Sequence, residues 1–233
     1  MVIQAQNLCP PSEYPGVQFR QASAEHLSFV KDNSVDAVFV GQAVHWFDHD
    51  KFFKEMHRIL RKDGTLAFWG YTDHVLVDFP KATAILHRHC LDRGGGDKND
   101  NRERLGYYWE RPGRKLVENY LRDIEPPSHR WKETKRMEYE PSLDGSITGQ
   151  GERVLHRKMT IGDCKEYMRT WSAYHKWMEA HPDRRKRDDS KEGDVIDSIF
   201  DEMAAAEGWY AAKMESLMVD VEWGTAIVMT RRR

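Results

Sequence analysis

The residues best placed for chemistry are His45 and Trp46, which belong to the stretch Gly-Gln-Ala-Val-His-Trp-Phe at residues 41–47. This stretch follows the run 35–40, whose β-branched and aromatic side chains are typical of a buried parallel strand. Ligands of open α/β sheets bind outside the carboxyl ends of the strands, so the stretch lies where a ligand would bind. Position alone equally allows His45 and Trp46 to be packing residues at a helix edge.

A second candidate is the pair Ala24 and Glu25. Residues 17–21 alternate polar and apolar side chains, which predicts a strand, and the pair follows that strand. We therefore expect Ala24 and Glu25 at the same sheet edge as residues 41–47. A carboxylate in such a place is usually only solvated.

The elements that position these residues form one unit. Asp48 or Asp50 can cap a helix that follows residues 41–47, and Asp63-Gly64 ends it with a residue free to adopt positive φ. Residues 66–69 then begin a second strand. A strand, helix and strand of this length make a right-handed βαβ unit, which predicts an α/β fold. The helix has one apolar stripe, made of Phe52, Phe53, Met56, Ile59 and Leu60.

The rest of the chain predicts helices and strands in alternation. We expect helices at 81–91, 114–124, 160–181 and from Asp194 or Asp197 to 206, and strands at 131–139 and 153–159. Residues 217–231 are one long bent strand or two strands broken at Trp223-Gly224. The helix at 160–181 has an aromatic stripe that is more often core than ligand cage, although one face can line a cavity. Its members are Tyr167, Met168, Trp171, Tyr174 and Met178.

Composition places broad limits on function. The 36 basic and 38 acidic residues give a net charge of −2, which implies neither a nucleic-acid nor a membrane-surface partner. No apolar run approaches the ~20 residues of a membrane-spanning helix. Cys9, Cys90 and Cys164 are widely spaced and odd in number, which favours reduced thiols and a cytoplasmic protein.

Two further motifs carry little weight. The glycines at 93–97 resemble a phosphate-binding loop, but they follow a predicted helix and enter a charged loop, so a connector is favoured. His87, His89 and Cys90 do not share one helix face and have no second ligand pair at suitable spacing. We therefore expect no metal site.

The run from residue 24 to residue 71 resembles the core of class I S-adenosylmethionine-dependent methyltransferases of the type 11 group. It is most similar to a fungal branch related to trans-aconitate methyltransferases. The shared features are the Ala-Glu after a strand, the Ser-Val-Asp strand entry, the Ala-x-His-Trp-Phe loop and the Arg-Ile-Leu-Arg-x-Asp-Gly-Thr-Leu turn. The similarity continues at 107–114, at 167–172 and in the terminal strand, so it covers nearly the whole chain.

The resemblance implies roles for individual residues. The cofactor, S-adenosyl-L-methionine, would lie against Ala24 and Glu25 on its adenine side, and against Gln42, Ala43 and Trp46 near the reacting methyl group. His45 would face the substrate and is the candidate general base where the acceptor must lose a proton. Tyr107, Tyr108 and Arg169 are candidates for the acceptor pocket, and Arg169 could pair with an acceptor carboxylate.

One expected unit of the family does not occur in this sequence. The family begins with a strand, a G-x-G-x-G turn, a helix and a second strand that ends in an acidic residue. Residues 1–6 resemble the helix after that second strand, so roughly 50–60 residues are lacking relative to the family, about one βαβ unit. We therefore expect an open edge on the strand at residue 35.

The sequence is thus interpreted as an α/β, Rossmann-like methyltransferase sheet, N-terminally truncated relative to the family, with a helical cap insertion. We expect a single domain over 1–233, with 1–76 and 209–233 as sheet core and about 77–208 as cap helices and remaining strands. The expected function is methyl transfer to a small molecule, such as a carboxylate or a secondary metabolite, impaired in this chain. The alternatives are a non-catalytic binding or scaffold protein, or a chain that recruits the lacking half from another.

Overall fold

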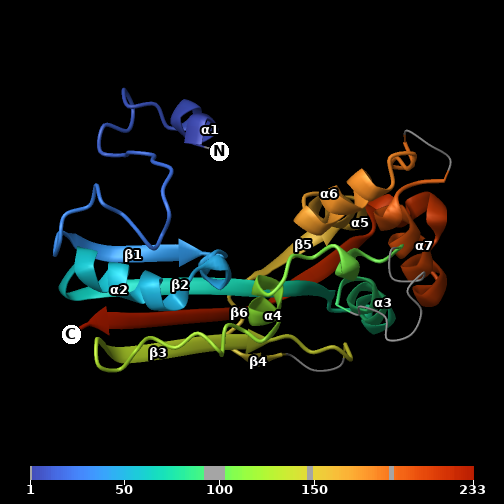
Figure 1. Ribbon diagram of the computed structural model, residues 1–233. Coiled ribbons are helices and arrows are strands. Elements are labelled where there is room, and N and C mark those ends of the chain that lie inside the picture. The colour runs from blue at the N-terminus through green and yellow to red at the C-terminus, as the bar shows by residue number, and fades with distance from the viewer. Residues whose placement is uncertain (1, 92–102, 146–148, 189–191) are drawn as a thin grey trace.

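The computed structural model describes residues 2–91, 103–145, 149–188 and 192–233. One mixed sheet runs through it, and several of the helices gather at one end of that sheet (Figure 1). This arrangement confirms the predicted α/β class. The strand order is β1-β2-β6-β3-β4, with β5 also paired to β6. The strands are β1 (Val35–Gly41), β2 (Leu60–Leu76), β3 (Trp131–Glu140), β4 (Gln150–Gly151), β5 (His156–Thr160) and β6 (Met218–Arg232).

The predicted βαβ unit is confirmed. β1 and β2 pair in parallel, with Val38 opposite Leu66. Helix α2 (His49–Ile59) connects them and is capped by Asp48, whose carboxylate accepts a hydrogen bond from the Lys51 N–H at 3.2 Å. The apolar stripe of α2 is buried against the sheet, in a core that Val40, Leu66, Phe68, Trp131 and Val228 complete.

The prediction that Asp63-Gly64 ends the helix is wrong, because α2 ends at Ile59 and both residues lie within β2, where its pairing with β1 is irregular. The positive φ is at Asp63, with a value of 64°, and not at Gly64. Gly64 is required for another reason: a Cβ there would lie 2.8 Å from the Arg61 carbonyl oxygen. The glycine therefore permits a close approach of two backbone segments.

The two longest strands, β2 and β6, pair antiparallel through the centre of the sheet. β6 is one continuous strand, so the predicted alternative of two strands broken at Trp223-Gly224 is wrong. The pairing shifts between Tyr71 and His74, where Tyr71 faces Thr225 and His74 faces Trp223. Three residue steps along β2 thus match two residue steps along β6. β2 therefore has one extra residue at this point, which is a β-bulge.

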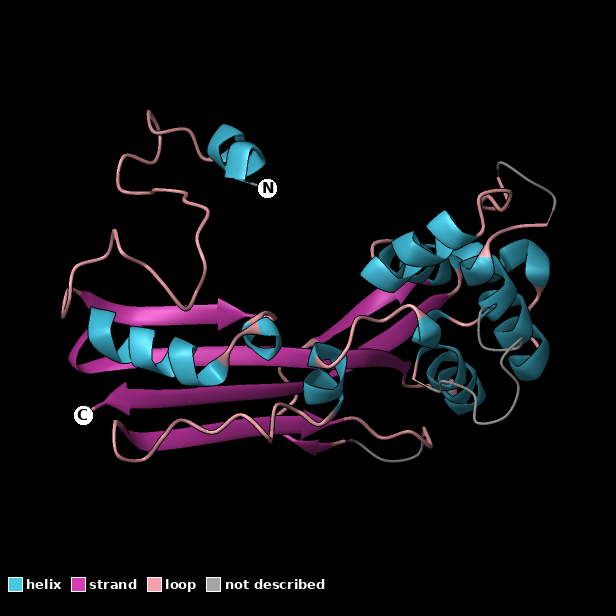
Figure 2. Ribbon diagram, viewed as in Figure 1, coloured by secondary structure: helices cyan, strands magenta, loops and turns pink. Residues whose placement is uncertain are grey.

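A second core lies at the helical end (Figure 2). The predicted long helix over 160–181 is wrong, because the chain breaks at Thr170 and Trp171. The Thr170 hydroxyl donates to the Tyr167 carbonyl at 2.7 Å, and Trp171 is extended, with ψ 142°. The helices of this end are α3 (Pro80–Cys90), α5 (Ile161–Arg169), α6 (Ser172–Ala180) and α7 (Val195–Glu207).

Other elements are shorter than predicted. The expected helix at 114–124 is α4 (Gly113–Glu118), which stops before Tyr120 and Leu121, whose φ values are 53° and 56°. The predicted strand at 17–21 is wrong: these residues form no strand, because no neighbouring strand offers them backbone partners. The 3₁₀ helices among the described residues are η1 (Val44–Trp46), η3 (Leu105–Tyr107) and η4 (Ala211–Ser216).

The free edge of β1 is the most unusual feature of the sheet. β1 ends the strand order and, among the residues that the structure describes, pairs with β2 alone, which confirms the expected open edge. Near that edge Phe39 is 68% exposed. Helix α1 (Val2–Leu8) has no buried residue and lies apart from the sheet on the side of β1 (Figure 1). Backbone N–H and C=O groups and an apolar side chain are therefore uncovered at this edge.

Two sequence predictions have a brief outcome. The glycine-rich residues 93–97 lie outside the described residues. Within the described part of the chain, no helix is long and apolar enough to cross a membrane. The division into a sheet core and a cap stays a prediction.

Candidate functional site

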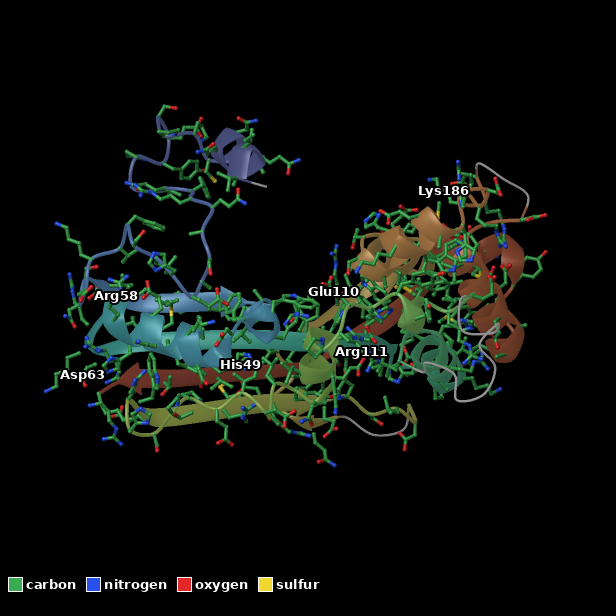
Figure 3. The ribbon with its side chains drawn as sticks, in the orientation of Figure 1. His49, Arg58, Asp63, Glu110, Arg111 and Lys186 are labelled. Atoms are coloured by element: carbon green, nitrogen blue, oxygen red, sulfur yellow. The ribbon has the colours of Figure 1, made fainter. Side chains whose placement is uncertain are left out.

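A cavity of about 280 Å³ lies where the carboxyl ends of β1 and β2 meet the helical end. Glu110 and Arg111 mark this junction in Figure 3. The cavity is at the sheet edge where ligands of open α/β folds bind. We call it the junction pocket, and its lining residues are Gln42, His45, Trp46, Tyr71, Thr72, Asp73, Trp109, Glu110, Arg114, Val117, Tyr167, Thr170, Trp171 and Ser172.

The bulge in β2 forms one wall of the junction pocket. Tyr71, Thr72 and Asp73 all line it, although side chains of a regular strand alternate between the two faces. A bulge re-aims side chains in this way. The opposite wall is aromatic, because Trp109 and Trp171 lie with their ring centroids 5.5 Å apart.

Arg114 is the only cationic side chain among the lining residues, and it is buried. Its Nη2 forms a short hydrogen bond to the carboxylate of Asp73, and its Nε donates to Glu118 at 3.1 Å. The guanidinium also lies 4.3 Å from the Trp109 ring centroid, a cation–π contact. Two carboxylates and one aromatic face therefore hold this charge in place.

His45 is buried at the end of η1, and its Nδ1 has no partner among the described residues. Burial, and then the charge of Arg114, lower the pKa of His45 to about 4. The imidazole is therefore neutral at neutral pH and a weak base. Trp46 beside it is 50% exposed, and Gly113 packs flat on its ring, where a Cβ would lie 2.7 Å from ring carbons.

Gln42 clamps β1 to β2. Its side-chain Nε2 donates to the Tyr71 carbonyl at 3.0 Å, and its Oε1 accepts from the Tyr71 N–H at 2.8 Å. The residue has a left-handed φ of 45°, which turns the chain into the loop. Both ends of the amide are thus used by the backbone of the neighbouring strand.

Replacing this clamp is expected to destabilise the pocket wall. Gln42→Ala leaves the two backbone groups of Tyr71 without these bonds, which we expect to lower the free energy of unfolding by about 2 kcal/mol. Urea denaturation of Gln42→Ala measures this loss, and Gln21→Ala, an exposed glutamine, is the matched control. An equal effect of the two substitutions would contradict the clamp.

Ala24, Glu25 and Ala43 lie beside the same loop. The Glu25 carboxylate accepts hydrogen bonds from the Ser23 hydroxyl and from the Asp48 N–H, the latter at 3.0 Å. The bond from Ser23 lowers the pKa of Glu25 most, and burial opposes it. Ala24 and Ala43 are half-buried against the core under α2. The structure thus joins the Ala-Glu pair to the start of α2, next to residues 41–47.

The three residues predicted for the acceptor pocket lie elsewhere. Tyr107 is 49% exposed, and Tyr108 packs on His181 with ring centroids 6.2 Å apart. Arg169 donates to Asp194 at 2.8 Å and to Glu166 at 2.9 Å. None of the three lines the junction pocket.

Sequence reasoning missed several lining residues for which a partial signal existed. Tyr167 and Trp171 belong to the aromatic stripe that allowed a cavity on one face, and Trp109 directly follows Tyr107 and Tyr108. Arg114 ends the run 107–114 that carries part of the resemblance. Asp73 has no local signal, because its partner Arg114 is 41 residues away. No group of three potential metal ligands occurs in the part of the chain that the structure describes.

Comparisons with known proteins agree with this geometry. Residues 1–68 match the family described as "Methyltransferase domain". A Saccharomyces cerevisiae protein named as a probable S-adenosylmethionine-dependent methyltransferase, CRG1, is 30% identical over 225 residues, which are 93% of this chain and 69% of that protein. A proposed methyltransferase of Dictyostelium discoideum is 24% identical over 216 residues, which are 93% of this chain and 66% of that protein.

A solved structure shares the fold. It is that of a proposed type II methyltransferase from Anaeromyxobacter dehalogenans, with 23% identity and a TM-score of 0.59 over 93% of this chain and 72% of that one. The chain spans about two thirds of the length of the two curated relatives. Its similarity to the yeast protein extends over almost its whole length, so the chain belongs to the class I S-adenosylmethionine-dependent methyltransferases, with S-adenosyl-L-methionine as the family's cofactor.

Proposed function

We propose that the junction pocket binds a small-molecule acceptor for the methyl group of S-adenosyl-L-methionine. The observation that carries this proposal is the position of the pocket at the carboxyl ends of β1 and β2, where Gln42, His45 and Trp46 line it. Methyl transfer depends chiefly on the alignment of the acceptor atom with the methyl carbon. A pocket fixed by two paired strands and a buried ion pair supplies such alignment.

His45 is the proposed proton acceptor for an acceptor molecule that must lose a proton. Its lowered pKa, about 4, keeps the imidazole unprotonated at neutral pH. The same shift makes it a weak base, so its contribution is limited to acceptors that release a proton readily. Of a carboxylate and a secondary metabolite, the second is favoured, because the single lining cation, Arg114, is already paired with Asp73 and Glu118.

The described residues fit the cofactor only in part. Trp46 is half-exposed and available for a ligand, but the Gln42 amide is used by Tyr71 and the Glu25 carboxylate by Ser23 and Asp48. The junction pocket, at about 280 Å³, is at the small end of ligand sites. These residues supply one wall of a cofactor site and do not enclose it.

We therefore propose that cofactor binding by this chain is impaired as it stands. The unpaired edge of β1 and the exposed Phe39 support this, because they leave the loop after β1 without a neighbouring strand. A further strand along β1 would cover the edge and complete the wall beside Trp46. The second candidate function, a non-catalytic methyltransferase-like binding protein, is favoured by the same open edge.

Titration calorimetry with S-adenosylhomocysteine tests these proposals. The 233-residue chain, once circular dichroism shows that it is folded, is expected to bind with a millimolar Kd or weaker. A chimera that places about 60 upstream residues of the yeast relative before this chain, roughly one βαβ unit, is expected to bind in the micromolar range. Micromolar binding by the chain alone would contradict impairment.

The chimera also separates the two functions. Trp46→Ala in the chimera is expected to weaken binding, whereas Tyr210→Ala, which removes an aromatic side chain that is 71% exposed, is the matched control. A folded chimera that binds no S-adenosylhomocysteine would favour the non-catalytic alternative.

A further inference from the structure

The charges that line the junction pocket are unbalanced. Asp73 and Glu110 contribute carboxylates, and Arg114 contributes the one guanidinium. Glu118 adds a second carboxylate to Arg114 from behind the wall. Lys176 pairs with Glu110 at 3.2 Å on the exposed rim, where solvent screens both charges. Over the lining residues as a whole, two carboxylates thus face one guanidinium, so the lining has a net negative charge.

An anionic acceptor would meet no free counter-charge there. The Arg114 side chain is 9% exposed and already holds two carboxylates. His45 is neutral, so it offers no positive charge either. A carboxylate that entered would lose its hydration next to Asp73 without compensation, which is strongly unfavourable.

A cation finds better partners in the same pocket. Five aromatic side chains line it: Trp46, Tyr71, Trp109, Tyr167 and Trp171. The faces of such rings attract cations, and more strongly where water is excluded. Arg114 shows this preference within the protein, since it already stacks on Trp109. The volume, about 280 Å³, suits a molecule with a single ring.

We propose that the junction pocket recognises a small aromatic or apolar amine, held as the ammonium between the aromatic walls and the carboxylates of Asp73 and Glu110. This inference deepens the proposed function and rests on it: the ammonium is the form that is recognised, and the amine accepts a methyl group only after it has released that proton to solvent, which frees its lone pair. Recognition itself requires only the pocket, so it is measurable without the cofactor.

Three probes of equal ring and similar size test the proposal: benzylamine, benzyl alcohol and benzoate. Titration of each into the 233-residue chain, followed by ligand-detected NMR, gives three dissociation constants at pH 7.5. Benzylamine is expected to bind at least about tenfold more tightly than benzoate, with benzyl alcohol between them. Benzoate binding as tightly as benzylamine, or no binding by any probe, would overturn the proposal.

Variants on the rim locate the effect. Glu110→Gln is expected to reduce the preference for benzylamine about threefold, because it removes one carboxylate while its exposed position spares the fold. Glu179→Gln is the matched control, because Glu179 is an exposed glutamate on α6 that does not line the pocket. An unchanged preference in Glu110→Gln would refute the role of Glu110. Benzylamine binding by the 233-residue chain, together with a folded chimera that binds no S-adenosylhomocysteine, would keep this inference and reject the methyl-transfer function.

Discussion

Asp194→Ala is expected to lower the free energy of unfolding by about 3–5 kcal/mol, the cost of leaving buried partners uncompensated. The Asp194 carboxylate is fully buried and accepts from Arg169 Nε and from the Tyr174 hydroxyl, each at 2.8 Å. It also caps α7 by accepting from the Asp197 N–H at 2.9 Å. Removal therefore leaves the Tyr174 hydroxyl without this acceptor, leaves Arg169 with only Glu166 and Asp197 among the described residues, and uncaps a helix at once.

Urea denaturation measures this loss, and Asp163→Ala is the matched control. Asp163 completes the capping box at the start of α5, but it is exposed and pairs only with Thr160. We expect a much smaller loss from it. Asp194→Asn, which keeps one acceptor oxygen and loses the charge, is expected to lie between the two. Equal small losses in all three would contradict the expected dependence of these contacts on Asp194.

His74→Leu is expected to flatten the acid dependence of stability. His74 is fully buried among Tyr167, Trp171 and Trp223, and neither ring nitrogen has a partner in the described structure. Burial lowers the pKa of His74 to about 4, against the opposing charge of Asp73. The unfolded chain, with an ordinary histidine pKa near 6.5, takes up a proton first as the pH falls. Stability is therefore lost between about pH 6.5 and pH 4, by an amount on the order of 3 kcal/mol from this residue.

Thermal or urea unfolding at pH 7.5, 5.5 and 4.5 measures the slope. His45 has a similar pKa and keeps its own contribution in both chains, so His74→Leu reduces the slope without abolishing it. At pH 7.5 the variant is expected to be at least as stable as the parent, because it removes two buried nitrogens without partners. His156→Leu, which removes an exposed imidazole, is the control. The same slope in the parent and His74→Leu would contradict the assignment.

Local sequence signals predicted the central unit well. An apolar run, an Asp cap and an amphipathic helix follow one another within residues 35–69, and the structure contains each of these features. Such elements need no knowledge of distant partners. The predicted strand at 17–21 failed because a strand forms only when another strand accepts its hydrogen bonds.

The site was less predictable because its geometry depends on distant residues. Arg169 and Arg114 look equally suitable in sequence, but Arg169 faces Asp194 and Arg114 faces Asp73. In the run Tyr107-Tyr108-Trp109, the third residue faces the pocket because the turn η3 ends at Tyr107. Which residue of such a run faces the pocket depends on how the turn packs, and amino-acid composition does not specify that packing.

The bulge in β2, a single extra residue, determines both which side chains line the pocket and which side chains are buried beyond it. Beyond it, Leu76 packs in the core at the helical end and His74 is buried among aromatic rings, whereas Tyr71 and Asp73 line the pocket. Deleting a single residue there would exchange the faces of everything that follows, because strand side chains alternate with a period of two. A change at the bulge therefore alters the lining of the pocket and the packing of the core at the same time. In a chain with a regular β2, we expect the residue at the position of Asp73 to leave the pocket wall.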